Sequence, residues 1–253
     1  MTVLCYHAVN PAWTSPISMH PDGLAAHLGW LAEHRTVIPL ASAVRELDVR
    51  GRLPRGAVAL TFDDGFASVH EHAWPQLARL RLPATVFLVA GTLTGAGHEV
   101  DWIDTPPPYE TRTLTVDQVL EMQADGVAFE SHSSTHADLT RLSHAECLAD
   151  LRDSREHLES VLGRPVRLLA YPRGRHAPHV RDAARKAGYT HAFALPDGPE
   201  PAGPYSLPRV GIYRDNGVRD LRLKVTPGYL ALRTGRPYQT VKRARRALVG
   251  GRR

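Results

Sequence analysis

The chain has 253 residues, of which 43% are hydrophobic and 23% charged, with a formal net charge of +5. This is an ordinary globular composition, large enough for one barrel-sized domain, and no run approaches the roughly 20 apolar residues of a membrane span. With only Cys5 and Cys147 present, a disulfide framework and a cysteine-rich zinc site are excluded.

The positive charge is concentrated at the C-terminus. After Asp220 there are 10 Lys and Arg residues and no acid, so the body of the chain is acidic and the tail, "TVKRARRALVGGRR", is basic. A frayed, solvated terminus and peripheral contact with an anionic membrane are both open for this tail. Nucleic acid is not expected, because no aromatic stacking platform accompanies the charges. The first residues lack a secretory signal pattern, which together with the few cysteines predicts a cytoplasmic location.

Short apolar runs alternate with segments of helical periodicity along most of the chain. We expect strands at residues 3–6, 37–40, 57–61, 84–89, 127–130, 168–171 and 192–195, and helices at 21–34, 69–80, 116–124, 144–162 and 178–187. Such alternation is typical of βα units around a parallel sheet, and about seven strands favour a distorted parallel (β/α) barrel. We place the barrel at residues 1–220 and a basic, partly helical extension at 221–253.

The helix at 144–162 has the clearest ends. Ser143 and Glu146 have the spacing of a capping box, and Gly163 is a suitable residue to end the helix. Two long segments rich in Gly, Pro and acids, 91–113 and 196–208, interrupt the alternation. Long loops at strand ends often form lids or substrate walls, although simple variability is the alternative.

Two adjacent carboxylates end one of the predicted strands, in "AVALTFDDGF". A turn is the simplest interpretation, because Asp-Gly is a common turn signal. A turn needs only one of the two acids, however, and neighbouring like charges resist burial. The pair Asp63 and Asp64 is more easily explained if a cation binds one of them.

Two histidines follow the strand at 127–130, in "SHSSTH". His132 and His136 are four residues apart and can face one way if the segment turns helically, which suits a transition metal. A chance pair of surface histidines is the alternative in a chain with 14 histidines. Position favours the metal, because strand ends on one rim of a parallel barrel converge on one site. Together with one aspartate they supply three mixed ligands and leave open positions, as catalytic zinc sites do.

These motifs resemble a known family. "TFDDG" and "HSSTH" are similar to the first two motifs of the polysaccharide deacetylases, carbohydrate esterase family 4, which share the NodB-homology domain; the likeness spans roughly residues 1–215. The resemblance implies that Asp63 is the general base, that Asp64, His132 and His136 hold the metal, and that this metal is usually zinc, with cobalt or nickel as alternatives.

The third family motif is matched only in part, by "AYPRG". Ala170 replaces an arginine that orients the base, and Arg173 stands where the family has a tyrosine. Because that tyrosine uses its backbone N–H to stabilise the oxyanion, Arg173 is expected to do the same. Another cation must orient Asp63, and Arg209 in "LPRVGI" is our candidate.

The family's last motif supplies a histidine that protonates the leaving amine, and nothing after Tyr213 matches it. "LCYHAV" instead places His7 at the end of the first strand, as in the circularly permuted subgroup that includes the poly-N-acetylglucosamine deacetylases. The first and last strands of a closed barrel are neighbours, so either can deliver this side chain. A buried histidine bonded to backbone is the alternative for His7.

The resemblance thus implies a metal-dependent carbohydrate N-deacetylase that acts on an acylated amino sugar. A second enzyme hypothesis is a deformylase or deacetylase of a lipid-linked or nucleotide-linked sugar. A third, of another class, is a carbohydrate-binding barrel without turnover. Asp63 argues against that third hypothesis, because binding a metal would not require a second carboxylate.

Overall fold

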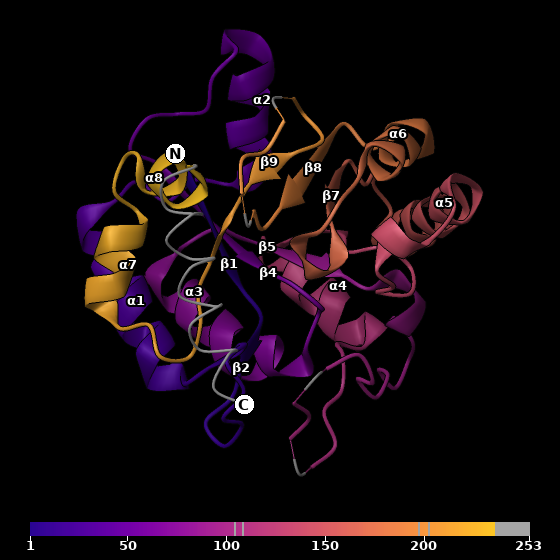
Figure 1. The fold of residues 1–253 in the computed structure, drawn as a ribbon. Helices are drawn as coiled ribbons and strands as arrows, with labels where there is room; N and C mark the ends of the chain where they lie inside the picture. The colour runs from indigo at the N-terminus through magenta and orange to yellow at the C-terminus, as the bar shows by residue number, and fades with distance from the viewer. Residues whose placement is uncertain (104, 108, 197, 202, 236–253) are drawn as a thin grey trace, which may run out of the picture.

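The computed structural model describes residues 1–103, 105–107, 109–196, 198–201 and 203–235. At its centre is an eight-stranded sheet in which every neighbouring pair is parallel, with the order β10-β1-β4-β5-β6-β7-β8-β9. Figure 1 shows the sheet curling on itself with helices around it. The strands are β1 (Thr2–Tyr6), β4 (Val58–Phe62), β5 (Ala84–Leu88), β6 (Ala128–Ser131), β7 (Leu168–Ala170), β8 (His191–Ala194), β9 (Leu207–Pro208) and β10 (Val210–Gly211). The predicted distorted (β/α) barrel is confirmed.

The barrel closes through one short segment of chain. Strand β9 pairs with β8 and strand β10 pairs with β1, and only Arg209 separates β9 from β10. The two end strands of the sheet are therefore the two halves of one extended segment that passes from the last strand to the first. Counted as one, this segment brings the sheet to seven strands; the sequence also predicts about seven, but it counts residues 37–40 in place of this segment.

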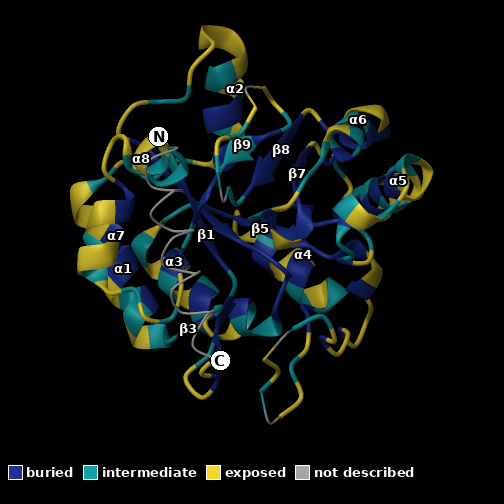
Figure 2. Cartoon of the chain, in the orientation of Figure 1, coloured by how far each residue is buried: buried dark blue, intermediate teal, exposed yellow. Residues whose placement is uncertain are grey.

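Two apolar cores lie on either side of the sheet. The larger core fills the space between the strands and the outer helices. The smaller core fills the barrel and includes Val3, Ala59, Phe87 and Phe193. Figure 2 shows the central strands buried along their length, whereas the outer helices are exposed on the side that faces solvent. Burial on both faces explains why the strands are apolar runs with no alternation.

The predicted strand at 37–40 is wrong. Val37 forms only an isolated bridge to Val58, and helix α2 (Leu40–Arg50) begins immediately afterwards. Leu40 and Val44 of this helix belong to the core inside the barrel. Pro39, inside the predicted run, cannot donate to a strand ladder but suits a helix start, which is why the chain forms a helix here.

Four predicted helices have the predicted bounds: α1 (Pro21–His34), α4 (Val116–Ala124), α5 (His144–Leu162) and α6 (Pro178–Ala187). The predicted helix at 69–80 is a π-helical turn, η1 (Val69–Ala73), followed by α3 (Trp74–Leu80). The capping box at Ser143 and Glu146 is present, and Gly163 ends α5 in the left-handed conformation with φ 65°. Short 3₁₀ turns, η2 (Ala90–Thr92), η3 (Leu139–Arg141) and η4 (Pro172–Gly174), and a small parallel pair, β2 (Ala8–Val9) with β3 (Ser18–Met19), complete the loops.

The C-terminal part continues in two helices, α7 (Val218–Lys224) and α8 (Tyr229–Thr234). Helix α7 packs against α1, and α8 packs against α7, so the chain around residue 220 lies against the barrel. The remainder of the predicted basic extension, residues 236–253, lies outside the described residues. Among the described helices, none combines the length and apolar character needed to cross a bilayer.

Candidate active site

A cavity of about 370 Å³ lies at the carboxyl ends of the barrel strands. Its wall is formed by residues that lie at most five positions after the ends of β1, β4, β6, β7 and β8. These are His7, Asp63, Asp64, His132, His136, Arg173, Gly174 and Leu195. The loop before β3 and the long loop after β5 close it with Ser15, Pro16, Ile17, Trp102, Ile103 and Thr105. Carboxyl strand ends meet on one rim of a parallel barrel, which brings together side chains as far apart in the sequence as His7 and Leu195.

Asp63 is held from below by a buried arginine. Arg209 Nη1 donates to Asp63 Oδ1 at 2.6 Å and Nη2 donates to Oδ2 at 2.7 Å. The guanidinium is buried inside the barrel, where it also donates to Thr61 Oγ1 at 3.2 Å and lies 5.2 Å from the centre of the Phe87 ring. The thiol of Cys5 on β1 donates to Asp63 Oδ2 at 3.3 Å.

This pairing keeps Asp63 ionised. Burial alone would raise the pKa of Asp63, but the positive charge and hydrogen bonds of Arg209, together with His132, outweigh burial and lower it to about 2. A carboxylate with both oxygens bonded to one planar guanidinium is also fixed in orientation. The structure therefore brings together Asp63 and Arg209, to which the sequence assigns the roles of base and orienting cation.

Asp64 faces the two predicted histidines. Its Oδ1 lies 3.1 Å from His136 Nε2 and 3.3 Å from His132 Nε2, and all three side chains are buried. Their donor atoms lie within 4.8 Å of one another, as the ligands of one ion would. Burial opposes the charge on Asp64, but the two imidazoles hold its pKa well below the usual range.

The hydrogen bonding around this cluster fits a metal ion. His132 Nδ1 bonds to the carbonyl oxygen of Ala170 at 2.8 Å, so Nδ1 carries a proton and Nε2 is the atom that faces Asp64. Asp64 Oδ1 is buried without a hydrogen-bond partner among the described residues. A carboxylate oxygen at 3.3 Å from His132 Nε2 needs a positive charge beside it, either a proton on Nε2 or a cation that both atoms bind. Asp64, His132 and His136 thus have the donor set and the unmet demand of a metal site.

The segment that carries the two histidines is not helical. The spacing of four residues had suggested that a helical turn would bring them to one side. Ser133 and His136 have positive φ values of 70° and 57°, which no helical turn contains. The segment instead loops back, and the two imidazole rings lie 5.1 Å apart at a tilt of 58°. Asp64 and Arg173, also on the cavity wall, have φ values of 69° and 58°. Strained non-glycine backbone is concentrated at this site, as is common in active sites.

Asp150 on α5 holds the histidine loop from behind, and the sequence gave no indication of this contact. Its two carboxylate oxygens accept hydrogen bonds from Ser134 N at 2.9 Å, Thr135 N at 3.2 Å and Thr135 Oγ1 at 2.7 Å. These bonds pull the middle of the loop toward α5 and leave His132 and His136 at its two ends. An acid on a helix surface carries no local signal of this role.

His7 lies where the sequence placed it, after β1 and half-buried in the cavity wall. A nitrogen of its ring lies within 4.8 Å of Cys5 Sγ and of an Asp63 oxygen. Its Nδ1 is buried and lacks a partner among the described residues, so His7 is not a histidine satisfied by backbone bonds. Burial lowers the pKa of His7, and the charges of Asp64 and Asp63 oppose that effect.

Arg173 reaches the cavity through η4, the turn after β7. Gly174 next to it packs so closely against Leu195 that an added Cβ would lie 2.4 Å from the Cβ of that leucine, which keeps the turn tight. The side chain of Arg173 points outward, where Nη2 donates to the carbonyl oxygen of Trp102 at 3.4 Å. The indole of Trp102 stacks on His136 with ring centres 5.0 Å apart.

A parallel (β/α) barrel with an Asp-His-His cluster and a second, separately held carboxylate at its strand ends defines the class of a metal-dependent hydrolase. The family model described as polysaccharide deacetylase matches residues 50–192, more than half of the chain. The chain belongs to the polysaccharide deacetylase family.

Similar proteins agree with this assignment. The Bacillus subtilis (strain 168) protein YxkH, whose name assigns it to the same family, is 24% identical over 231 residues, 90% of this chain and 72% of its own length. A poly-beta-1,6-N-acetyl-D-glucosamine N-deacetylase of Staphylococcus aureus (strain N315) is 24% identical over 210 residues, 78% of this chain and 69% of its own length. The solved Streptococcus pyogenes deacetylase PplD in complex with acetate is 26% identical, covers 90% of this chain and 98% of its own, and superposes with a TM-score of 0.76.

Proposed function

We propose that this protein is a metal-dependent hydrolase that removes an N-acetyl group from an amino-sugar-containing glycan or glycoconjugate. The observation that carries the proposal is the separation of the two adjacent aspartates. Asp63 is bound by Arg209 and Cys5, whereas Asp64 faces the imidazoles of His132 and His136 in the same cavity. A site built only to bind a metal would not need a second carboxylate, Asp63, held separately by Arg209 and Cys5.

In this proposal Asp64, His132 and His136 hold the metal, which is zinc, with cobalt or nickel as substitutes. When bound there, the ion supplies Lewis-acid polarisation of the amide carbonyl and of the attacking water. Asp63 Oδ2 lies 3.9 Å from His132 Nε2, so the base is next to the metal position without taking part in the cluster.

The protein's own groups then move the protons. As the oxygen of water bonds to the amide carbon, Asp63 accepts one of its protons, and the backbone N–H of Arg173 donates to the oxygen that becomes negative. When the carbon–nitrogen bond breaks, His7 donates a proton to nitrogen, because an amine anion is too basic to leave unaided. Acetate and a free amino sugar result, and the proton on Asp63 passes to solvent or back to His7.

The wall of the cavity favours a small acyl group. Ile17, Ile103, Leu195 and Trp102 supply its apolar part, next to the metal cluster. The similarity to a poly-N-acetylglucosamine deacetylase supports an N-acetylated sugar as the substrate. The cytoplasmic location and the membrane contact of the basic tail stay predictions from the sequence.

Metal content and acyl release, measured side by side, test the proposal. Untagged protein is analysed for metals and assayed on β-1,6-linked N-acetylglucosamine oligomers, on N-formyl analogues and on a nucleotide-linked N-acetyl sugar. We expect about one equivalent of zinc and acetate release that is lost on chelation and restored by zinc. Preference for the formyl or nucleotide-linked compounds would mean that one of these, and not an N-acetylated glycan, is the substrate. Bound zinc without release of any acyl group would favour the carbohydrate-binding barrel instead.

A further inference from the structure

Three side chains beside the Asp-His-His cluster form a second group of possible metal ligands. Cys5 on β1, His7 just after it and Asp63 after β4 each offer one ligand atom, and these atoms lie within 4.8 Å of one another. Cys5 and Asp63 are buried, and His7 is half-buried. Because His7 and Asp63 line the cavity of the candidate active site, an ion that enters this cavity reaches the group directly. Sulfur, nitrogen and oxygen are the three donor types that zinc binds in proteins.

The distance between two of these ligand atoms fits a shared ion. Cys5 Sγ lies 3.3 Å from Asp63 Oδ2, to which its thiol donates a hydrogen bond. With a Zn–S bond of about 2.3 Å and a Zn–O bond of about 2.1 Å, two ligands of tetrahedral zinc lie about 3.5 Å apart. An ion can therefore replace the thiol proton between sulfur and oxygen with little movement of either side chain.

The ligand atoms can accept an ion although Asp63 is held by Arg209. The guanidinium donates one hydrogen bond to each carboxylate oxygen, at 2.6 and 2.7 Å. Since each carboxylate oxygen offers two lone-pair sites, Oδ2 keeps one for the thiol or for an ion in place of the thiol proton. His7 Nδ1 is buried without a hydrogen-bond partner within the described part of the chain, so no such bond dictates which ring nitrogen presents a lone pair.

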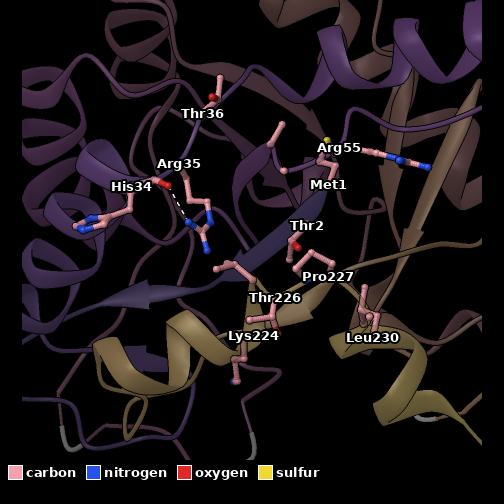
Figure 3. A pocket seen from close by; sticks show the side chains of 14 residues that line it. Met1, Thr2, His34, Arg35, Thr36, Arg55, Lys224, Thr226, Pro227 and Leu230 are labelled. Carbon is pink, nitrogen blue, oxygen red and sulfur yellow. Dashed lines mark hydrogen bonds between the residues drawn. The ribbon is translucent and has the colours of Figure 1, made fainter.

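The larger cavity at the opposite end of the barrel has no comparable group. It has a volume of about 830 Å³ and lies at the amino ends of β1 and β4 (Figure 3). The residues that line it include no cysteine, aspartate or glutamate, and Figure 3 shows Arg55 extending away from Arg35. Among the residues that the structure describes, groups of three possible metal ligands occur only at the active-site end of the barrel.

We propose that Cys5, His7 and Asp63 form a second, inhibitory site for zinc, separate from the Asp-His-His cluster. Binding forms a bond from the ion to each of the three ligand atoms and releases the Cys5 proton to solvent. Arg209 already offsets the charge of Asp63, so this ion is held less tightly than an ion on the Asp-His-His cluster and binds after it. The two ion positions are neighbours, because Asp63 Oδ2 lies 3.9 Å from His132 Nε2.

Occupancy of the second site stops the proposed reaction. Asp63 can no longer accept a proton from water through the oxygen that is bonded to the ion, and the bonded nitrogen of His7 has no proton to donate. This inhibition rests on the proposed function, whereas the metal site itself does not. Excess zinc would then block the same enzyme that the first zinc ion activates.

Cobalt spectroscopy on the full-length protein tests the site without any need for turnover. Cobalt bound to a thiolate gives a charge-transfer band in the near ultraviolet, whereas cobalt bound only to carboxylate and imidazole does not. Protein that carries one equivalent of zinc is titrated with Co²⁺, and equilibrium dialysis counts the total bound metal. The variants are Cys5→Ser, His7→Gln and, as a matched control, Cys147→Ser, which removes the other buried thiol.

We expect the band in the parent and in Cys147→Ser as total bound metal rises from about one to about two equivalents. Cys5→Ser should show no band and should bind only the first ion. His7→Gln should bind the second ion about tenfold more weakly or worse, which keeps the test decisive if Cys5→Ser disturbs the barrel interior. No band in the parent, a band that persists in Cys5→Ser, or unchanged affinity in His7→Gln would overturn the proposal.

Acetate release in excess zinc, measured on the same proteins, tests the inhibition. Zinc beyond the first equivalent should lower the rate of the parent by about tenfold or more and leave that of Cys5→Ser within about twofold of its own rate at one equivalent. An undiminished rate with both ions bound would overturn the inhibitory role. A protein that shows the cobalt band but releases no acyl group would contradict the proposed function and still support the second site.

Discussion

Arg209 and Asp63, 146 residues apart in the sequence, form two parallel hydrogen bonds of 2.6 and 2.7 Å inside the barrel. The family's usual source of this arginine, the third motif, here contains Ala170, and the guanidinium comes instead from the segment that closes the barrel. Arg209 thus supplies a positive charge at Asp63 although the third motif lacks its arginine.

Replacing Arg209 with methionine is expected to shift the pH dependence of the reaction. Burial alone would raise the pKa of Asp63, but Arg209 lowers it to about 2, so the carboxylate stays ionised in mildly acidic solution. The acid-side fall in kcat/KM should therefore move to higher pH in Arg209→Met, with partial recovery in Arg209→Lys. A pH profile that keeps its acid limb in Arg209→Met would mean that another group controls Asp63.

The same variant should also lose stability. Removing one partner of a buried ion pair typically costs about 3–5 kcal/mol. Since the folded-state pKa of Asp63 is depressed, the stabilisation by the pair is present above the ordinary pKa of about 4 and is lost as pH falls toward 2. Chemical unfolding at pH 7 and at pH 3 should therefore show a larger deficit at pH 7. An equal deficit at both values would argue against an ionised Asp63.

The two aspartates should respond differently to the same substitution. Asp63→Asn is expected to abolish turnover with zinc content near one equivalent, because Asp63 does not belong to the Asp-His-His cluster. Asp64→Asn is expected to lose zinc, because it removes a charged ligand that faces both imidazoles. Elemental analysis of both variants beside an acetate-release assay makes the comparison. Zinc loss in Asp63→Asn would show that the division of roles is reversed or shared.

His7→Gln should discriminate between substrates with poor and good leaving groups. Protonation of the leaving group by a positioned acid is typically worth about 10²–10⁴ in rate. The amine of an amide needs that proton in order to leave, whereas the leaving group of 4-nitrophenyl acetate is a stable phenolate that does not. We expect kcat on the amide to fall by at least about 10²-fold, with activity on the ester within a few-fold of the parent. Equal losses on both substrates would assign His7 to positioning or metal binding.

Cys5 contacts Asp63, the base of the proposed mechanism, and offers a graded test of its orientation. Its thiol donates to the same Asp63 oxygen as Arg209 Nη2. A hydrogen bond of this kind contributes about 1 kcal/mol, which corresponds to roughly a fivefold effect. Cys5→Ala should lower kcat by about that factor at unchanged KM and zinc content, and Cys5→Ser should restore it. A kcat that Cys5→Ser fails to restore would attribute the loss to packing in the barrel.

Asp150 should matter for metal affinity although it lies outside the cavity. It accepts three hydrogen bonds from the loop between His132 and His136. Groups that orient ligands from behind typically change metal affinity by about 10–100-fold. Competition with a chelator should show weaker zinc binding in Asp150→Ala than in Asp153→Ala, a matched change on the same helix. Equal affinities would mean that the loop keeps its shape without α5.

The sequence predicts the elements of this fold that have a strong local signal. Helices α1, α4, α5 and α6 match their expected bounds because a proline or a capping residue marks the start of each and the apolar spacing runs their whole length. Helix α2 was missed because its buried face, Leu40 and Val44, plugs the inside of the barrel, a tertiary role with no local pattern. Short strands such as β9 and β10 were missed because two residues cannot show a period.

The site was predictable wherever a motif sits at a strand end. Asp63, Asp64, His132 and His136 follow β4 and β6, so the convergence of parallel strands brings them together. The contacts of Cys5 and Asp150 were not predictable, because each reaches the site across the fold from an element with no distinctive sequence. Arg209 has no motif of its own, and it became a candidate only because Ala170 stands where the family has the arginine that orients the base.

The closure of the barrel by residues 207–211 gives the active site a built-in dependence on the integrity of the fold. The peptide that joins the last strand to the first also carries the guanidinium that keeps Asp63 ionised and oriented. Detachment of this segment would therefore open the barrel and remove the guanidinium from Asp63 in a single event.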